Sequence, residues 1–158
     1  MAYHCLHQPV ELEAVGVAAR SLALQSHVLQ ASSERDLDVI FADLISMNVD
    51  GLVIGGEPFF NSRSGQLGGL SARHKVPTIF QLREFTEGGG LASYGADLID
   101  SYRQVGVYAG RILKGERPAD LPIEEPSKFD FVINLKTAKA LGITVPAKLL
   151  FTADEVIE

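Results

Sequence analysis

Short apolar runs alternate with helical patterns along most of the chain, and few folds accommodate that order. The runs with strand character are HVLQA, GLVIGG, VPTIF, GLASYG and FDFVI. Strands separated by helices form parallel sheets with helices packed on both faces. We therefore expect an α/β fold, a three-layer lobe built on a parallel sheet. The 158 residues fit a single domain, 1–158, that can bury a core without disulfides or metal.

Between these runs, apolar residues recur at helical spacing. Ser33-Glu34-Arg35-Asp36 fits a capping box, and Lys114-Gly115 is a typical helix end. The segments 81–89 and 117–128 are interpreted as a loop and an extended connector. The predicted helices cover residues 10–25, 37–45, 61–74, 98–113 and 134–142.

The charge and the residue composition of the chain indicate which classes of partner and metal site to expect. A net charge of −6 without a basic stripe argues against a nucleic-acid partner. Cys5 is the single cysteine and cannot form an internal disulfide. His4 and His7 have a spacing that can hold a metal, but they lie beside the chain start, and we expect no metal site. The start has no signal-peptide pattern and no apolar run has bilayer-spanning length, so the chain as written is expected in the cytoplasm.

The stretch EGGGLASYG, residues 87–95, raises the question of a phosphate site. Phosphate-binding glycine loops follow a strand and lead into a helix N-terminus, whereas these glycines precede an apparent strand. No Gly-Lys-Ser/Thr, G-x-G-x-x-G or G-x-S-x-G pattern is present. We expect no cofactor, no enzyme activity and a tight loop with positive φ. The loop is either a plain turn or a place where the backbone approaches a ligand or a second lobe.

Open parallel sheets bind ligands beyond the carboxyl ends of their strands. Three loops follow predicted strands, GGEPFFNSR, QLREFTEGG and SYGADLID, and we expect all three at one edge of the sheet. The candidate solute-binding residues in them are Glu57, Phe59, Phe60, Asn61, Arg83, Glu84, Ser93, Tyr94 and Asp97.

These side chains have suitable chemistry and also plain structural alternatives. Two adjacent aromatic rings, Phe59 and Phe60, can stack on a solute, or one can be core while the other covers a helix end. Glu84 can pair with a solute ammonium and Arg83 with a solute carboxylate, or both are surface charges.

Four further positions have an equally simple local role. Ser62 and Asp97 are both predicted as helix caps, and capping is also the structural alternative for Asn61. The ring and hydroxyl of Tyr94 suit a cleft wall and suit the core as well.

Four stretches carry a resemblance to a known family: GGEPFFNSR, RHKVPTIFQLREFTEGGGLASYG, YRQVGVYAGRILKGERPADLPIEEPSKF and VINLKTAKALGITVPAKLLFTADEVIE. From Ala14 to the end, the chain resembles the C-terminal part of ABC-transporter substrate-binding proteins, which include tryptophan- and tyrosine-type amino-acid binders. The resemblance implies a type I periplasmic-binding-protein fold. In that fold two α/β lobes close on a small solute and deliver it to a membrane permease, in the periplasm.

The start of the chain departs from the family pattern. Members carry an export signal and an N-terminal lobe, and MAYHCLHQP poorly matches the strand that opens the second lobe. We expect a half-length relative, a fragment or a misplaced start codon. A micromolar site corresponds to a binding free energy of about −8 kcal/mol. If one lobe alone kept half of it, about −4 kcal/mol, its affinity for the solute would be millimolar. A missing first strand exposes a sheet edge or core face, which predicts a homodimer.

The favoured interpretation is therefore a solute-binding component, or half-length relative, of an ABC-type uptake transporter, with an amino acid as one candidate solute. A stand-alone flavodoxin-like domain with a phosphate-bearing cofactor is one alternative, against which the missing phosphate motif counts. A self-associating sensory half-domain is another.

Overall fold

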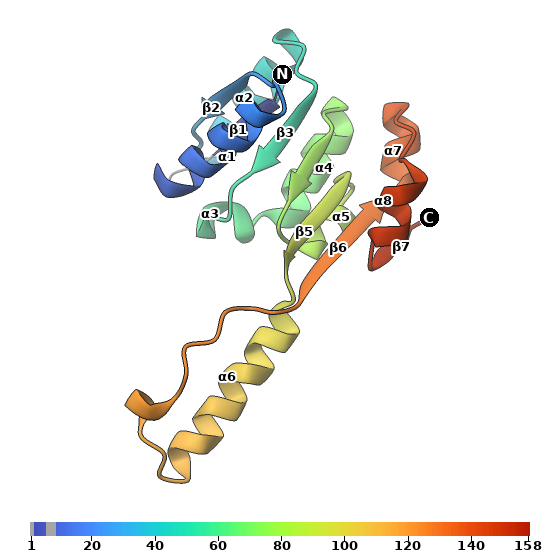
Figure 1. Cartoon of the computed structure of the whole chain (residues 1–158). Helices are drawn as coiled ribbons and strands as arrows, with labels where there is room; N and C mark the ends of the chain where they lie inside the picture. The colour runs from blue at the N-terminus through green and yellow to red at the C-terminus, as the bar shows by residue number, and fades with distance from the viewer. Residues whose placement is uncertain (1, 6–8) are drawn as a thin grey trace.

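The computed structural model describes residues 2–5 and 9–158, with side chains from Glu13 onward. Among these residues, seven strands form one sheet in the order β2-β1-β3-β4-β5-β6-β7 (Figure 1). Strands β1 to β5 are mutually parallel, β6 runs antiparallel to β5, and β7 is parallel to β6. The bounds are β1 (Ala2–Cys5), β2 (Ser26–Leu29), β3 (Gly51–Ile54), β4 (Thr78–Phe80), β5 (Ala92–Ala96), β6 (Phe129–Asn134) and β7 (Glu155–Ile157).

The first strand corrects one expectation. Ala2 pairs with Ser26 on one side and with Gly51 on the other, so β1 lies inside the sheet. The strand that opens the lobe is present, and the bare edge expected from its loss does not exist. The suggested metal pair of His4 and His7 lies outside the described side chains.

The helices agree with most of the predicted ranges, although α5 occupies a segment predicted as a loop and α8 was not predicted. The capping box at the start of α2 is confirmed, because Ser33 Oγ accepts the Asp36 N–H and the Asp36 carboxylate accepts the Ser33 N–H. The bounds are α1 (Pro9–Ser21), α2 (Glu34–Ser46), α3 (Pro58–Asn61), α4 (Ser64–His74), α5 (Arg83–Glu87), α6 (Leu98–Leu113), η1 (Pro118–Asp120), α7 (Leu135–Leu141) and α8 (Ala147–Thr152).

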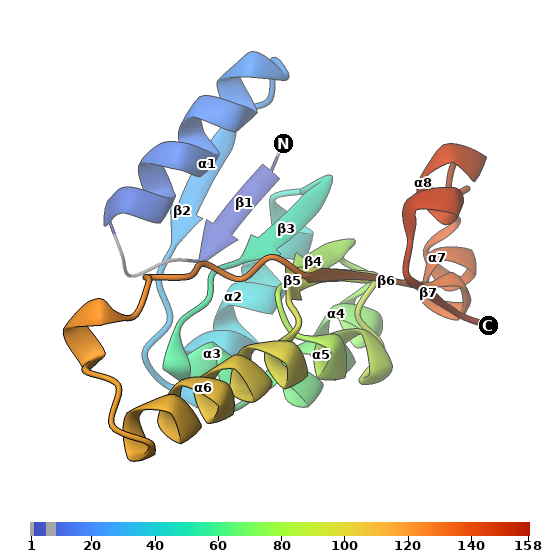
Figure 2. The ribbon, with the colours of Figure 1, turned by 60° about the horizontal axis from the view of Figure 1, so that its bottom comes forward.

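The core lies between the sheet and the layer of α2, α4 and α5. Alternate residues of β3 and β4 point into it, while α1 lies on the opposite face at the β1–β2 end (Figure 2). This placement follows from right-handed crossovers, which put the helices before and after β2 on opposite faces. The core residues include Leu37, Phe41, Leu44, Leu52, Ile54, Phe60, Leu67, Phe80 and Phe85.

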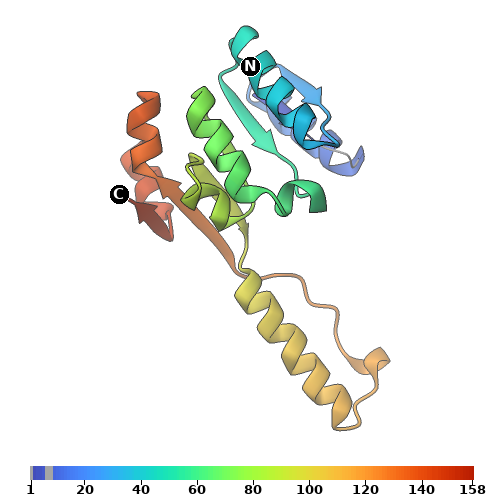
Figure 3. The same cartoon turned by 180° about the vertical axis from the view of Figure 1, so that it is seen from behind.

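Residues 98–128 form an arm that projects from this body (Figures 1 and 3). The chain leaves the sheet at the end of β5, forms α6, and returns through η1 and an extended connector to β6. None of the residues of α6 is buried. The arm therefore contributes nothing to the core.

Candidate functional site

The three predicted loops do begin at one edge of the sheet. Because β3, β4 and β5 are parallel neighbours, their carboxyl ends lie side by side. The Gln81 amide donates a 2.8 Å hydrogen bond to Asn61 Oδ1 and joins the first two loops. A hollow of about 120 Å³ opens beyond β4 and β5, and its polar lining is Gln81, Arg83, Glu84, Ser93, Asp97 and Asp130.

Arg83 and Glu84, both predicted, lie at the rim on the first turn of α5. The Arg83 guanidinium donates to both Glu155 carboxylate oxygens at 2.6 Å and to Glu87 at 2.8 Å. These contacts raise the pKa of Arg83, and the hydrogen bond from Arg83 lowers the pKa of the Glu155 carboxyl. Glu84 is exposed to solvent. The carboxylate is therefore more available to a solute than the guanidinium.

The strand β5 separates Ser93 from Tyr94, since neighbouring side chains in a strand point to opposite faces. Ser93 is buried on the helix side and lines the hollow. Tyr94 is 56% exposed on the other face, stacks on Phe129 at 5.7 Å and meets Phe131 edge-on at 6.1 Å. Tyr94 therefore does not line the hollow beyond β4 and β5 but borders a separate hollow of about 380 Å³ on the other face, together with Val53 and Ile79.

Asp97 confirms its predicted cap. Its carboxylate accepts the Asp100 N–H at 3.0 Å at the start of α6 and pairs with Lys128 at 2.5 Å. The Lys128 hydrogen bond, followed by the Asp100 N–H, lowers the pKa of the Asp97 carboxyl. Asp130 lies opposite Gly95 across the β5–β6 pair and adds another carboxylate to the hollow. The sequence pattern gave no signal for Asp130, because nothing in it indicated an antiparallel β6.

In the loop that follows β3, the aromatic rings of Phe59 and Phe60 pack against the core and not into the hollow. Phe60 is 2% exposed within the core and offers no surface to a solute. Phe59 packs against the core and meets Phe60 edge to face at 5.3 Å. Glu57 is the half-buried residue that precedes α3. None of the three lines the hollow at β4 and β5.

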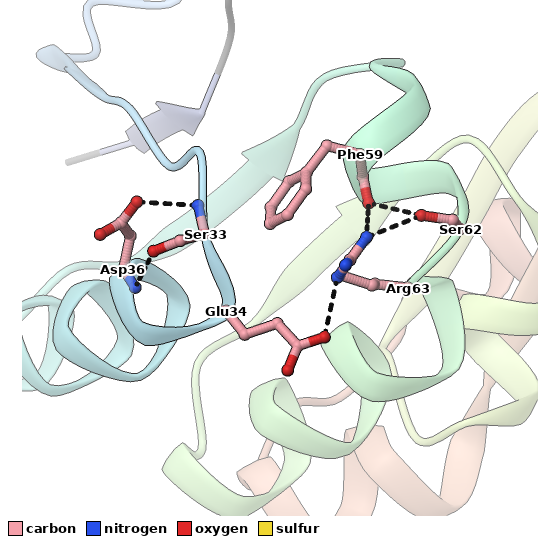
Figure 4. Close-up of polar contacts among 6 residues, drawn as sticks. All are labelled: Ser33, Glu34, Asp36, Phe59, Ser62 and Arg63. Atoms are coloured by element: carbon pink, nitrogen blue, oxygen red, sulfur yellow. Dashed lines mark hydrogen bonds and ion pairs between the residues drawn. The ribbon is translucent and has the colours of Figure 1, made fainter.

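Arg63 explains the position of Phe59 (Figure 4). Its guanidinium lies 4.3 Å from the centre of the Phe59 ring and donates to the Phe59 carbonyl oxygen, Ser62 Oγ and the Glu34 carboxylate. Ser62 is the C-terminal cap of α3, and its hydroxyl also donates to the Phe59 carbonyl. Phe59 therefore covers a helix end, as the structural alternative proposed.

The glycine loop after α5 is a packed turn. The N–H groups of Gly88, Gly89 and Gly90 donate to the carbonyl oxygens of Glu84, Thr86 and Phe85 respectively. Gly89 has the predicted positive φ, +110°. A Cβ at Gly90 would lie 2.0 Å from the Phe85 ring, so the backbone approaches the core. With all three N–H groups engaged, this loop offers no donor to a phosphate.

A second hollow, of about 270 Å³, lies within the arm between α6 and the connector. Tyr108 Oη donates to the Pro122 carbonyl at 2.8 Å, and the acidic side chains there include Asp100, Glu124 and Glu125. This second hollow is larger than the hollow at β5. It does not lie at the carboxyl edge of the sheet, and that edge is where α/β folds bind ligands.

Among the described residues, no group of His, Cys, Asp and Glu side chains is arranged to hold a metal ion. No described helix has the length and apolar character of a membrane span.

A mostly parallel sheet flanked by helices, with a polar hollow at its carboxyl edge, defines a lobe of the periplasmic-binding-protein class. The sequence profile of the family described as ABC transporter substrate binding protein matches residues 10–157. The chain belongs to this family. The predicted family and fold class are thereby confirmed.

Three solved structures illustrate the similarity. An ABC domain from Streptococcus pneumoniae in complex with L-Trp is 26% identical with a TM-score of 0.85, over 99% of this chain and 55% of that one. A conserved domain protein from Vibrio cholerae O1 biovar El Tor is 21% identical with a TM-score of 0.84, over 98% and 54%. A ligand-free, open substrate-binding protein with adhesive properties from Clostridium difficile is 19% identical with a TM-score of 0.67, over 99% and 53%.

This chain thus spans about half the length of each solved structure. No functionally curated protein sequence matches it.

Proposed function

We propose that the chain is a solute-binding lobe of an ABC-type uptake system and that it holds a small amino acid or related solute at the carboxyl edge of its sheet. The observation that carries the proposal is the polar hollow beyond β4 and β5, in a chain of the substrate-binding family. The partner downstream is a membrane permease, and the place of action is the periplasm or the cell exterior.

The charges of the hollow indicate which end of an amino acid this lobe binds. Glu84 and Asp130 contribute carboxylates, whereas the Asp97 carboxylate is held by Lys128 and the Arg83 guanidinium by Glu155 and Glu87. Charge-assisted hydrogen bonds to a carboxylate favour an ammonium group. We therefore assign the ammonium end to this lobe, and the carboxylate and side chain of the solute to an opposing wall.

The size of the hollow supports a shared site. Pockets that enclose a small organic ligand measure roughly 300–1,000 Å³, whereas this hollow measures about 120 Å³. One wall of this size accounts for only part of the binding free energy, so we expect millimolar affinity for the lobe acting alone. A neighbouring lobe or a second copy would complete the site.

The test is a titration with L-tryptophan, because a similar solved domain contains it. Amide shifts in ¹H–¹⁵N NMR spectra should move at Gln81–Glu84 and Ser93–Asp97 as the amino acid is added. Replacing Glu84 by Gln removes one charge-assisted hydrogen bond and should weaken binding by roughly tenfold.

Asp38→Asn is the matched control, since Asp38 is an exposed carboxylate on α2, away from the hollow. It should leave the affinity unchanged. Equal affinities for the two variants would show that the solute binds elsewhere. No shift with tryptophan or with any other of the common amino acids would overturn the proposed function.

A further inference from the structure

Gln81 lies where two hollows of the sheet meet. It is the first residue after β4, and it lines the hollow of about 120 Å³ beyond β4 and β5 as well as the hollow of about 380 Å³ on the other face. Among the described residues, no other lines both of these hollows. A solute that enters either hollow therefore lies beside Gln81.

Close packing leaves Gln81 little freedom to move. A Cβ added at Gly56, in the turn after β3, would lie 2.6 Å from Gln81 Oε1 and 3.0 Å from its Cδ and Nε2. A Cβ added at Gly95, in β5, would lie 2.2 Å from the Gln81 carbonyl oxygen and 3.1 Å from its Cβ. Two glycines, one beyond β3 and one in β5, thus make room for Gln81.

Asn61 fixes the orientation of the Gln81 amide. Gln81 Nε2 donates to Asn61 Oδ1 at 2.8 Å, so Oε1 is the end of the amide that is left to accept a hydrogen bond. Asn61 is anchored in turn at the end of α3, where its N–H donates to the Glu57 carbonyl at 2.8 Å. Arg63 joins the same segment to α2 through its ion pair with Glu34 (Figure 4). The Gln81 oxygen is therefore held in place before any solute binds.

The hollow beyond β4 and β5 combines this oxygen with two charged acceptors. Gln81 Oε1 has no hydrogen-bond partner among the described residues. Glu84 and Asp130 line the same hollow with carboxylates. An ammonium group carries three N–H donors. Two carboxylates and one neutral acceptor match that number.

We propose that Gln81 is a solute-binding residue whose side-chain oxygen accepts a hydrogen bond from the ammonium group, and that Asn61 is a positioning residue. The Asn61–Gln81 hydrogen bond keeps the Gln81 oxygen, rather than its N–H groups, available to the solute. This inference rests on the proposed function, and it adds a neutral, preorganised contact to the carboxylates already assigned.

The affinity for L-tryptophan, measured by ¹H–¹⁵N NMR, tests the role of Gln81. Gln81→Met keeps the length of the side chain but removes the amide, and it should weaken binding roughly tenfold. Gln25→Met is the matched control, because Gln25 is exposed just before β2, at the opposite edge of the sheet. It should leave the affinity unchanged. Equal affinities of the two variants would overturn the role of Gln81.

The side-chain N–H signals of Gln81 separate a solute contact from a packing effect. These signals, assigned by their loss in the Gln81→Met spectrum, should move with L-tryptophan and with tryptamine, which keeps the ammonium group but lacks the carboxylate. They should stay in place with indole-3-propionic acid, which lacks the ammonium group. Signals that move with indole-3-propionic acid and not with tryptamine would overturn the ammonium contact.

Two substitutions test Asn61. Asn61→Leu removes the acceptor of the Gln81 N–H and should weaken tryptophan binding roughly fivefold. Asn61→Asp retains an acceptor and should bind at least as tightly as the parent chain. An Asn61→Leu variant with the parent affinity would refute the positioning role.

The Glu84→Gln variant separates this inference from the proposed function. If Glu84→Gln weakened binding while Gln81→Met did not, this inference would fail and the proposed function would stand. A parent chain that bound no common amino acid would overturn both.

Discussion

At the scale of single residues, Asn134 connects three parts of the fold. The residue is buried at the end of β6, where Oδ1 accepts the Thr137 N–H at 3.0 Å and caps α7. Its Nδ2 donates to the Thr86 carbonyl at 3.0 Å, at the end of α5. Thr137 Oγ1 donates in turn to the Gly89 carbonyl in the glycine loop. One amide therefore fixes α7 against the loop that follows α5.

Replacing Asn134 by Ala should lower the free energy of unfolding by about 2–3 kcal/mol, because a cap is lost and buried polar groups lose their partners. The comparison is Ser33→Ala, which removes an exposed cap alone and should cost about 1 kcal/mol. Urea unfolding followed by circular dichroism measures both. Equal losses would mean that the Asn134–Thr86 hydrogen bond contributes nothing.

The candidate site shows how far single residues can be read from the sequence. Glu84, Ser93 and Asp97 were placed at the hollow by one rule, that polar groups after parallel strands meet at one edge. Asp130 was missed because it comes from β6, whose reversed direction depends on the path of the arm rather than on its own residues. For Phe59 the sequence left a solute contact and a structural role open, because it did not indicate that Arg63, four residues further on, covers the ring.

At the scale of elements, the glycines of the loop after α5 are required by its close contacts with the Phe85 ring and with α4. A Cβ on Gly90 would lie within 2.4 Å of several atoms of the Phe85 ring, and that ring is fully buried in the core. A Cβ on Gly88 would lie 2.7 Å from the Gly65 carbonyl in α4. These contacts require glycine for close packing against the core, whereas the sequence left open a plain turn or an approach of the backbone to a ligand or a second lobe.

Gly90→Ala should therefore destabilise the protein by about 3 kcal/mol, as overpacking of a filled core does. Gly65→Ala is the control within the same layer, since nothing lies within 4 Å of its added Cβ. Its effect should stay within about 0.5 kcal/mol. The measurement is the urea midpoint of each variant, and similar midpoints for both would contradict the packing account.

Elements with a strong periodic signal were predicted well, and short ones were not. The stripe from Leu37 to Ile45 and the apolar run in β3 gave clear patterns, and both elements are present. Helix α5 has five residues, too few for a helical period to repeat. The residues of β1 match the family pattern poorly, yet the pairing of this strand with β2 and β3 places it inside the sheet.

At the scale of the whole molecule, stability should depend on pH through carboxyls in separate regions. Hydrogen bonds from Ser32, Lys128 and Arg83 are the main causes that lower the pKa values of Asp36, Asp97 and Glu155 respectively. A carboxyl with a depressed pKa in the folded state contributes stability above its unfolded pKa. That contribution is lost as pH falls through the folded pKa.

The free energy of unfolding should therefore be nearly constant from pH 7 to pH 5 and decrease below about pH 4, near the unfolded pKa values. Urea unfolding at a series of pH values measures this decrease. Arg83→Gln removes the Glu155 contribution and should make the decrease shallower. An unfolding free energy that rises on acidification would show that these contacts do not stabilise the folded state.

The arm has a consequence for how such a protein can diverge over time. The core cluster is drawn entirely from residues between Leu37 and Phe85, and α6 adds no buried side chain to it. Substitutions in the core are selected against when they destabilise the fold, whereas substitutions in α6 leave the core packing unchanged. A lineage can therefore keep the core residues unchanged while the exposed residues of α6 diverge.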